Sequence, residues 1–356
     1  MDNPSFYFLS SRVVNESTIN GHPCLASETL EKVETIRALV STIIPVFNRA
    51  SLLLEAIDSV LGQTYRPIEI IIVDDGSTDE TGSIADSLAA AHPGFISVLH
   101  LPNQGPGLAR EAGRQVAKGE FIQYLDSDDI LLPCKFELQV TALNARPDCG
   151  VAYGKTDYIL HGSQPMRIPW KRTGETIEWM FPAFLHSRWW GTSTPLYRRE
   201  LTDAAGAWLS LCNEEDWEYD CRIAAMGVRL CYVAEFVSVE RDHGGVRLSK
   251  GGSDSPIKLR DRATAHSLIL EHAIRAGIRV DDIEMQQFAR ELFLLARQCG
   301  AAGLVPESRD LFAHAAIASG ADRAKGLDFR LYKIAAAFLG WSLAGRFACS
   351  IDRLRR

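Results

Sequence analysis

The chain lacks the sequence features that mark several large classes of protein. None of its eight cysteines stands in Cys-x-x-Cys spacing with another, so neither a zinc site nor a redox dithiol is expected, and free thiols in a reducing cytoplasm account for them. No run approaches the roughly 18 apolar residues that a membrane-spanning helix needs. The N-terminal stretch has no basic segment followed by an apolar core, so no signal peptide is expected. A net charge of −7 argues against a general nucleic-acid binder, because such proteins are more often basic.

Two common nucleotide-binding signatures are also absent. The glycine-containing loop at 103–107 is not followed by Gly-Lys-Ser or Gly-Lys-Thr, and no Gly-x-Gly-x-x-Gly follows the first apolar run. What remains is an ordinary globular composition, with 46% hydrophobic and 23% charged residues over 356 positions. That length predicts about two domains.

Apolar runs that alternate with helical patterns predict the fold. The β-branched runs predict four strands, at residues 38–47, 68–73, 96–100 and 121–125. Apolar residues at helical spacing, bounded by glycine or proline, predict a helix after each strand. This repeated alternation is typical of a doubly wound, mostly parallel sheet, so we expect an α/β fold of Rossmann-like type.

The second half of the chain indicates a change of architecture. Further strand-like pieces continue the sheet, at 151–153, 157–160, 193–197 and 228–233. A Gly- and Ser-rich stretch at 241–256 predicts a mobile loop, and from residue 257 Ala, Leu and Arg recur at helical spacing. We therefore expect three parts: an N-terminal lead-in at 1–37, an α/β domain at 38–256 and a C-terminal α-helical module at 257–356.

Acidic or polar residues follow three of the predicted parallel strands. They are Pro45–Arg49 after the first strand, Asp74 and Asp75 after the second, and Asp126–Asp129 after the fourth. Because the carboxyl ends of parallel strands meet at one edge of a sheet, we expect a single site there. Either acidic cluster alone is more often a surface turn. Together, their hard oxygen atoms suit Mg²⁺ or Mn²⁺ bound with substrate phosphates.

The loop at 103–107 opens the third predicted helix. The N-terminus of a helix with nearby glycines can receive phosphate on its backbone N–H groups. Gly105 and Arg110 are therefore candidates for contact with a diphosphate. An ordinary surface arginine is the alternative for Arg110.

Four segments carry a resemblance when they are taken in order. They are Val-Ser-Thr-Ile-Ile-Pro-Val-Phe-Asn-Arg (40–49), Ile-Ile-Val-Asp-Asp-Gly-Ser-Thr-Asp-Glu-Thr (71–81), Asn-Gln-Gly-Pro-Gly-Leu-Ala-Arg (103–110) and Leu-Asp-Ser-Asp-Asp (125–129). This order resembles the family 2 glycosyltransferases of GT-A fold over about residues 38–250. The resemblance implies an inverting, metal-dependent transfer of sugar from a nucleoside-diphosphate sugar to a saccharide or glycolipid acceptor. It also implies a role in bacterial polysaccharide or glycoconjugate synthesis.

The resemblance assigns most candidate residues to the donor. The expected donor or nucleotide contacts are Pro45, Val46, Phe47, Arg49, Asp74, Asp75, Gly105, Arg110, Asp126, Asp128 and Arg247. Among them, Asp75 is most similar to the acid that reads the nucleobase. The Asp-x-Asp acids of the family hold a divalent metal, and the ligands of Mn²⁺ or Mg²⁺ expected here are Asp128, Asp129 and His243. Which of Asp126, Asp128 and Asp129 binds the metal directly stays open.

The same resemblance identifies a candidate catalytic base. The segment Asn-Glu-Glu-Asp-Trp at 213–217 is similar to the Glu-Asp motif that begins a helix beside the acceptor. We assign the base to Asp216, with Glu215 as second choice, because a carboxylate in reach of a sugar hydroxyl can take its proton. Without the resemblance, these acids would be read as residues favoured at the N-terminus of a helix.

The acceptor and the partners are less well defined by the sequence. Trp189 and Trp190 are candidates for the acceptor pocket, with core packing as the alternative. The C-terminal helix expected at 329–356 is basic and contains a tryptophan, which would suit a membrane surface. Packing within the helical module or in a homo-oligomer is the interpretation we favour. We expect a cytoplasmic protein, peripheral at the inner face of the plasma membrane if this helix binds lipid.

Two other functions stay open. A nucleotidyltransferase that makes a nucleotide-sugar usually carries a glycine-rich basic loop after its first strand, whereas Pro-Val-Phe-Asn-Arg stands at 45–49. A non-catalytic scaffold with a GT-A-like fold is the second alternative, and the intact acids at all three strand ends argue against it.

Overall fold

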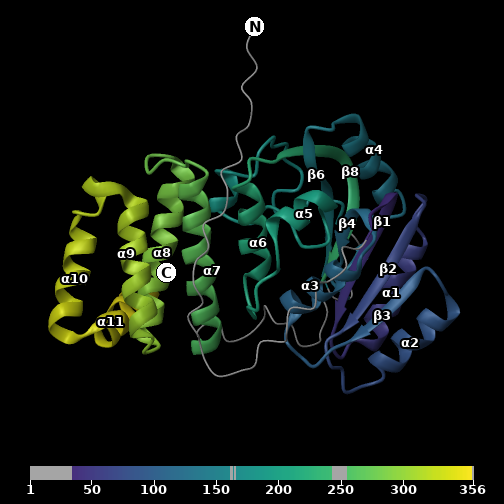
Figure 1. Ribbon diagram of the computed structural model, residues 1–356. Helices are drawn as coiled ribbons and strands as arrows, with labels where there is room; N and C mark the ends of the chain where they lie inside the picture. The colour runs from purple at the N-terminus through teal and green to yellow at the C-terminus, as the bar shows by residue number, and fades with distance from the viewer. Residues whose placement is uncertain (1–33, 161–162, 164–165, 243–254, 355–356) are drawn as a thin grey trace, which may run out of the picture. The chain divides into compact units, whose positions relative to one another are not determined.

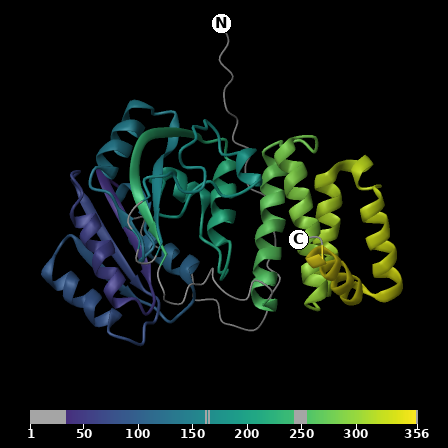
Figure 2. The same ribbon diagram turned by 180° about the vertical axis from the view of Figure 1, so that it is seen from behind.

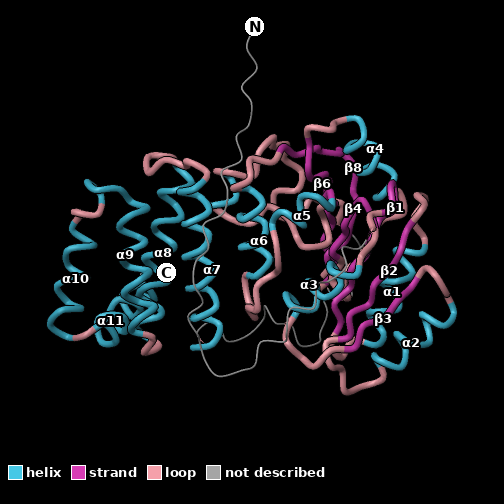
Figure 3. Tube along the Cα trace, viewed as in Figure 1, coloured by secondary structure: helices cyan, strands magenta, loops and turns pink. Residues whose placement is uncertain are grey.

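One mixed sheet organises the α/β part of the chain. In the computed structural model, which describes residues 34–160, 163, 166–242 and 255–354, eight strands run in the order β3-β2-β1-β4-β7-β6-β8-β5. The first four are β1 (Ile36–Val46), β2 (Ile68–Asp74), β3 (Ile96–His100) and β4 (Gly119–Tyr124). They are mutually parallel, which confirms the predicted alternation. Figure 3 shows this sheet in magenta between helices.

The other half of the sheet contains antiparallel pairs. Its strands are β5 (Ile130–Leu131), β6 (Cys149–Ile159), β7 (Leu196–Arg198) and β8 (Arg229–Arg241). β7 is antiparallel to β4 and β6, and β8 is parallel to β6. The two strand pieces predicted at 151–153 and 157–160 are one strand, because β6 continues through irregular pairing around Gly154 and Lys155. The pairing of β6 with β8 also extends β8 well beyond the predicted end at residue 233.

Helices cover both faces of the sheet (Figure 1). One face packs against α1 (Ala50–Leu61), α2 (Thr81–Ala91) and α4 (Lys135–Ala145). The other packs against α3 (Pro106–Val116), α5 (Arg199–Ala205), α6 (Glu215–Ala224) and the short 3₁₀ helix η1 (Ala183–Leu185). Neighbouring residues of β1 face opposite sides, as strand geometry requires: Ile43 joins one core and Ile44 the other. Burial on both sides explains why these strands read as continuous apolar runs.

Helices follow the sheet at the C-terminal end of the described chain. They are α7 (Pro256–Arg275), α8 (Ile283–Ala301), α9 (Val305–Arg323), α10 (Leu327–Leu339) and α11 (Trp341–Leu354). Figure 2 shows them, in green and yellow, from the side opposite to Figure 1. The single helix predicted at 329–356 is wrong, because Gly340 adopts a φ of 81° and separates α10 from α11. Glycine reaches this left-handed conformation without the steric cost that a Cβ would impose.

The helix α7 packs directly on α6. The ring of Trp217 on α6 meets His266 of α7 edge-on at 5.2 Å between centroids, and His266 stacks on Phe288 of α8 at 5.4 Å. His272 Nε2 lies 2.8 Å from Glu218 Oε1, which joins the same two helices by a buried polar contact. Buried apolar side chains from the sheet and from α7, α8 and α9 belong to one continuous cluster. The C-terminal helices therefore support the element that carries the predicted base.

Candidate functional site

The carboxyl ends of β1, β2 and β4 meet at one edge of the sheet, as the sequence predicts. Val46 at the end of β1 pairs with Asp74 at the end of β2, and Ile43 pairs with Tyr124 at the end of β4. The backbone N–H of Asp75 donates to the carbonyl of Val46 at 2.9 Å. The segments after these strands therefore lie side by side, and we call this the carboxyl edge.

Asp75 fixes the loop that begins α3. Its Oδ1 accepts a hydrogen bond from the backbone N–H of Gln104, and its Oδ2 accepts one from Gly105, each at 2.8 Å. Burial raises the pKa of Asp75 despite these two amide donors. Asp75, the predicted nucleobase contact, thus connects the end of β2 to the loop that begins α3.

Asp74 organises the turn after β2. Its Oδ1 accepts from the backbone N–H of Ser77 at 3.0 Å, and its Oδ2 lies 3.0 Å from Nδ1 of His100. Burial alone would raise the pKa of Asp74, but the hydrogen bonds from Ser77 and His100 lower it overall. Both oxygens of this carboxylate therefore have protein partners.

The segment after β1 places an arginine beside the acidic loop. Phe47 is exposed, and Asn48 takes a left-handed φ of 51° that turns the chain. The backbone N–H of Arg49 then donates to Thr81 Oγ1 at 2.9 Å, and its guanidinium forms an ion pair with Asp128. One predicted donor residue thus contacts one predicted metal ligand.

Ser193 and Arg241 shape the acidic loop after β4. Ser193 Oγ donates to Asp129 Oδ2 at 2.7 Å and accepts from the backbone N–H of Asp126 at 3.2 Å. Arg241 donates its backbone N–H to Asp129 Oδ1 at 3.3 Å and its Nε–H to the carbonyl of Asp128 at 2.6 Å. Burial, and then the charge of Asp128, raise the pKa of Asp129 well above its usual range. Asp129 is therefore buried, and both of its carboxylate oxygens have protein partners.

Arg110 joins the acidic loop to α6. Its two terminal nitrogens donate to Asp126 Oδ1 at 2.7 Å and to Glu215 Oε1 at 2.8 Å. The guanidinium carbon lies 4.9 Å from the ring centroid of Trp208, in cation–π range. Burial would lower the pKa of Arg110, but the two carboxylates raise it overall. Arg110 is therefore a buried bridge, which excludes the surface alternative.

The N-terminus of α6 presents two neighbouring carboxylates in different surroundings. Glu215 is buried, and burial followed by the charge of Asp216 raises its pKa. The side chain of Asp216 is 30% exposed and accepts from the guanidinium of Arg188. Burial would raise the pKa of Asp216, but Arg188 lowers it overall. Of the two carboxylates, Asp216 is thus the one with a lowered pKa and a partly exposed side chain.

A buried network that the sequence did not reveal holds Arg188. Its Nε donates to Asp220 at 2.6 Å, and Asp220 also accepts from Trp190 Nε1 at 3.0 Å and from the hydroxyl of Tyr197 at 2.8 Å. Asp220 follows Asp216 by four residues on α6, so both face the same side of the helix. That spacing was the only available signal, and it gave no indication of Arg188.

The two tryptophans considered for the acceptor pocket lie in the core. Trp190 is fully buried, and Trp189 is 2% exposed beneath the guanidinium of Arg172, 3.8 Å from its ring centroid. A sugar cannot stack on rings that are covered by protein. The structure thus corrects the acceptor assignment and favours the core-packing alternative.

The acidic loop has two partly exposed carboxylates, which alone are too few to enclose a divalent cation. Within the described ranges, no group of three or more His, Cys, Asp and Glu side chains could hold a metal ion. Asp126 and Asp128 have side chains 32% and 15% exposed, whereas both oxygens of Asp129 already accept hydrogen bonds. One or two carboxylates plus substrate phosphates are a common Mg²⁺ site. The predicted ligand His243 lies outside the described residues, as does Arg247.

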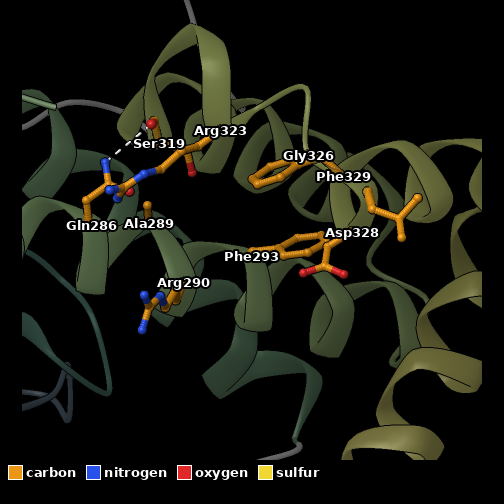
Figure 4. A pocket seen from close by; sticks show the side chains of 10 residues that line it. Gln286, Ala289, Arg290, Phe293, Ser319, Arg323, Gly326, Asp328 and Phe329 are labelled. Atoms are coloured by element: carbon orange, nitrogen blue, oxygen red, sulfur yellow. Dashed lines mark hydrogen bonds between the residues drawn. The ribbon is translucent and has the colours of Figure 1, made fainter. Parts of the chain in front are cut away.

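A separate cavity of about 320 Å³ lies among α8, α9 and α10. Figure 4 shows the rings of Phe293 and Phe329 on one side of it, and Gln286, Arg290 and Arg323 on the other. It shares no residue with the carboxyl edge or with the N-terminus of α6.

Curated relatives match only part of this chain. An uncharacterised glycosyltransferase of Rickettsia prowazekii is 45% identical over 106 residues, which cover 30% of this chain and 32% of that protein. The glycosyltransferase GlyG of Streptococcus pneumoniae is 45% identical over 94 residues, covering 26% and 31%. The uncharacterised glycosyltransferase YibD of Escherichia coli is 31% identical over 157 residues, covering 42% and 45%. The chain thus spans about a third to under a half of the length of these relatives.

A solved structure and a family model complete the comparison. Residues 1–349 of TarS from S. aureus are 18% identical with a TM-score of 0.63, and the alignment covers 89% of this chain and 92% of that one. This likeness shows that the fold, including helices after the sheet, is shared with a GT-A structure. Residues 41–200 match the model of glycosyl transferase family 2. The chain therefore carries a family 2 glycosyltransferase domain with the GT-A fold.

Proposed function

We propose that this protein is an inverting glycosyltransferase that moves a sugar from a nucleoside-diphosphate sugar to an acceptor hydroxyl. The observation that carries the proposal is the bridge through Arg110, which sets the acidic loop at Asp126 beside the N-terminus of α6 at Glu215. A group that binds a leaving diphosphate and a group that takes a proton must both flank the reacting carbon, and this bridge sets them near one another.

The carboxyl edge is proposed to bind the donor. Phe47 follows β1 and is exposed, and the carboxylate of Asp75, which follows β2, accepts two hydrogen bonds from the loop that begins α3. The guanidinium of Arg49 is held beside Asp128 by an ion pair and is proposed to contact the diphosphate. Four further predicted donor residues belong to the backbone of the carboxyl edge and are proposed to shape the donor site there. They are Pro45, Val46, Asp74 and Gly105.

Asp126 and Asp128 are proposed to hold Mn²⁺ or Mg²⁺ together with the donor diphosphate. They are the carboxylates of the loop that reach solvent, and Asp129 instead holds Ser193 and the backbone of Arg241. When bound, the cation would neutralise charge on the departing nucleoside diphosphate.

Asp216 is proposed to be the general base. Its carboxylate is partly exposed, and the ion pair with Arg188 keeps it deprotonated while fixing its orientation. It takes the proton of the acceptor hydroxyl as the oxygen forms its bond to the anomeric carbon and the diphosphate leaves from the opposite side. A single displacement of this kind inverts the configuration. Glu215 is less suited to the role, because Arg110 occupies it in a buried pair.

The nucleotide is proposed to be one of the common sugar carriers, with uridine tested first. The fold is shared with TarS, which has been solved in complex with UDP and with UDP-GlcNAc. The acceptor is proposed to be a saccharide or glycolipid of a bacterial polysaccharide or glycoconjugate. We also propose that residues 38–256 carry the chemistry and that 257–356 support α6.

The test compares two substitutions in the full-length protein, with a panel of UDP-, GDP- and dTDP-sugars and Mn²⁺. We expect Asp216→Asn to lower transfer by at least about a hundredfold, within the range that acid–base catalysis contributes. Asp128→Ala should also lower transfer strongly, because the cation would no longer neutralise charge on the leaving diphosphate. Only Asp128→Ala should weaken metal-dependent nucleotide binding, measured by calorimetry. Asp310→Asn, an exposed aspartate of α9, serves as the control and should leave both unchanged. Near-normal turnover in either variant would exclude the assigned role.

The same panel separates the two other functions. A nucleotidyltransferase would release pyrophosphate from a nucleoside triphosphate and a sugar phosphate, and a scaffold would neither transfer nor hydrolyse any nucleotide-sugar in the presence of metal. The segment Pro45–Arg49 in place of a basic glycine-rich loop argues against the first of these.

A further inference from the structure

The helix α10 is apolar on a side that faces away from the protein. Leu327, Leu331, Ile334 and Phe338 recur at the spacing of one helical face, and all four are exposed, Phe338 to 85%. The opposite side of the same helix is buried, as Tyr332 shows. The helix therefore has one apolar side to pack in the module and a second one left in solvent.

The helix α11 repeats this arrangement. Leu343, Phe347, Ile351 and Leu354 lie on one side and are exposed, Leu354 to 87%, while Ala344 on another side is buried. The two helices contact one another. We call these eight side chains the α10–α11 stripes. Exposed apolar side chains gathered along neighbouring helices are typical of an interaction site.

Charge along the chain is strongly uneven at this end. Residues 327–356 contain six Lys or Arg and two Asp, a net charge of +4, so that the remaining residues carry −11 of the total of −7. Arg330, Lys333 and Arg346, which lie on α10 and α11, are exposed. A sequence that is acidic as a whole thus contains a basic pair of helices with exposed apolar sides.

We propose that the α10–α11 stripes dock on an anionic lipid bilayer. Amphipathic helices with Leu and Phe on one side and Lys or Arg beside it lie in the plane of a membrane interface, and each cation near an anionic surface adds to the attraction. A second copy of this chain fits the surface less well, because it would oppose one +4 segment with another. None of the helices in the described ranges is long and apolar enough to cross a bilayer, so docking is in the interface. This inference does not depend on the proposed transferase activity.

The test measures co-sedimentation of the full-length protein with vesicles, without donor or metal. We expect binding to vesicles of phosphatidylcholine with 30% phosphatidylglycerol, and at least about tenfold weaker binding to phosphatidylcholine alone. The double substitution Phe338→Ser/Phe347→Ser should weaken binding to the anionic vesicles at least about tenfold, because two exposed rings no longer enter the interface. Ile257→Ser/Ile283→Ser, which removes two exposed apolar side chains elsewhere, should bind like the unaltered protein.

Charge is tested separately. Arg330→Glu/Lys333→Glu should weaken binding at least about thirtyfold, since each cation near such a surface contributes about 1 kcal/mol. Arg37→Glu/Lys118→Glu makes the same change in net charge on exposed residues near the start of β1 and β4 and should have little effect. Failure of the unaltered protein to bind anionic vesicles overturns the proposal. So does binding that survives the phenylalanine substitutions, or a dimer in ultracentrifugation that the same substitutions abolish while no vesicle binding occurs.

Discussion

Replacing Arg188 with methionine would test the network that supports the proposed base. The guanidinium is almost fully buried and bonds to two carboxylates of α6, Asp216 and Asp220. Asp220 is completely buried, so removing its cation leaves a charge with only the Trp190 and Tyr197 donors. Breaking one partner of a buried ion pair typically costs about 3–5 kcal/mol. Asp216 is partly exposed, so losing its ion pair with Arg188 should lower the unfolding free energy by less than about 1 kcal/mol.

The loss of stability should depend on pH in a defined direction. Burial raises the pKa of Asp220 while Arg188 opposes that shift, so Arg188→Met raises this pKa further. A carboxyl group with a raised pKa in the folded state destabilises that state once the pH exceeds its unfolded pKa of about 3.9. Arg188 also lowers the pKa of Asp216, which stabilises the folded protein above about pH 3.9. The variant loses this contribution, so both aspartates increase its loss of stability as the pH rises. The deficit of the variant should therefore be largest near pH 7 and should narrow as the pH falls toward 4.

The measurement is urea unfolding of both proteins at pH 7 and pH 5, followed by tryptophan fluorescence. The second substitution Asp220→Asn, made in the Arg188→Met protein, removes the stranded charge and should restore about 2 kcal/mol or more of the free energy of unfolding. A variant within about 1 kcal/mol of the unaltered protein at pH 7 would refute the reasoning. A double variant no more stable than the single one would do the same.

Activity gives a second measure of the same contact. Arg188→Lys keeps a positive charge but cannot span Asp216 and Asp220 with a planar fork. Because Arg188 lowers the pKa of Asp216, the acid limb of kcat/KM should move to higher pH in this variant, with little change in donor KM. An unmoved acid limb would show that Asp216 is not the group that titrates.

Two further predictions concern the packing around the site. Gly107→Ala should cost about 1–3 kcal/mol in unfolding free energy, because its Cβ would overlap the carbonyl oxygen of Leu209, whereas Gly62→Ala should cost less with a nearest contact at 3.2 Å. Equal losses in the two variants would contradict this. Lys135 is fully buried, burial holds its pKa well below the usual range, and its Nζ donates to Thr194 at 2.6 Å. A lowered lysine pKa destabilises the folded protein at neutral pH, and this penalty disappears above the unfolded pKa of about 10.4. The unfolding free energy of Lys135→Met, measured in urea and taken relative to the unaltered protein, should therefore be higher at pH 7 than at pH 10.

The parallel half of the fold was within reach of sequence reasoning. Its strands are buried on both faces and read as continuous apolar runs, and glycines and prolines mark their ends. The acids at Asp74, Asp75 and Asp126–Asp129 could be placed at one edge, because parallel strands fix where their carboxyl ends lie. The periodicity could not show that β6 is one strand, since its pairing is irregular around Gly154.

The partners of the acids could not be predicted in the same way. Arg110 was singled out, but its bridge to Glu215 spans 105 positions, and Arg188 contacts α6 across 28 and 32 positions. Such contacts depend on tertiary packing, for which local spacing carries no information. The two tryptophans illustrate the same limit, because aromatic residues suit a sugar and a core equally well.

The contact of α7 with α6 has a consequence for how such proteins diverge. The segment that matches the family ends at residue 200, before α6 begins, whereas the carboxyl edge at the ends of β1, β2 and β4 lies inside it. His266 and His272 of α7 contact Trp217 and Glu218 of α6, and α7 lies in a part of the chain that the family model does not cover. Under the assignment proposed above, substitutions in α7 would change the surroundings of Asp216 and leave the carboxyl edge unchanged. Acceptor choice and donor choice would then be able to diverge separately in proteins of this kind.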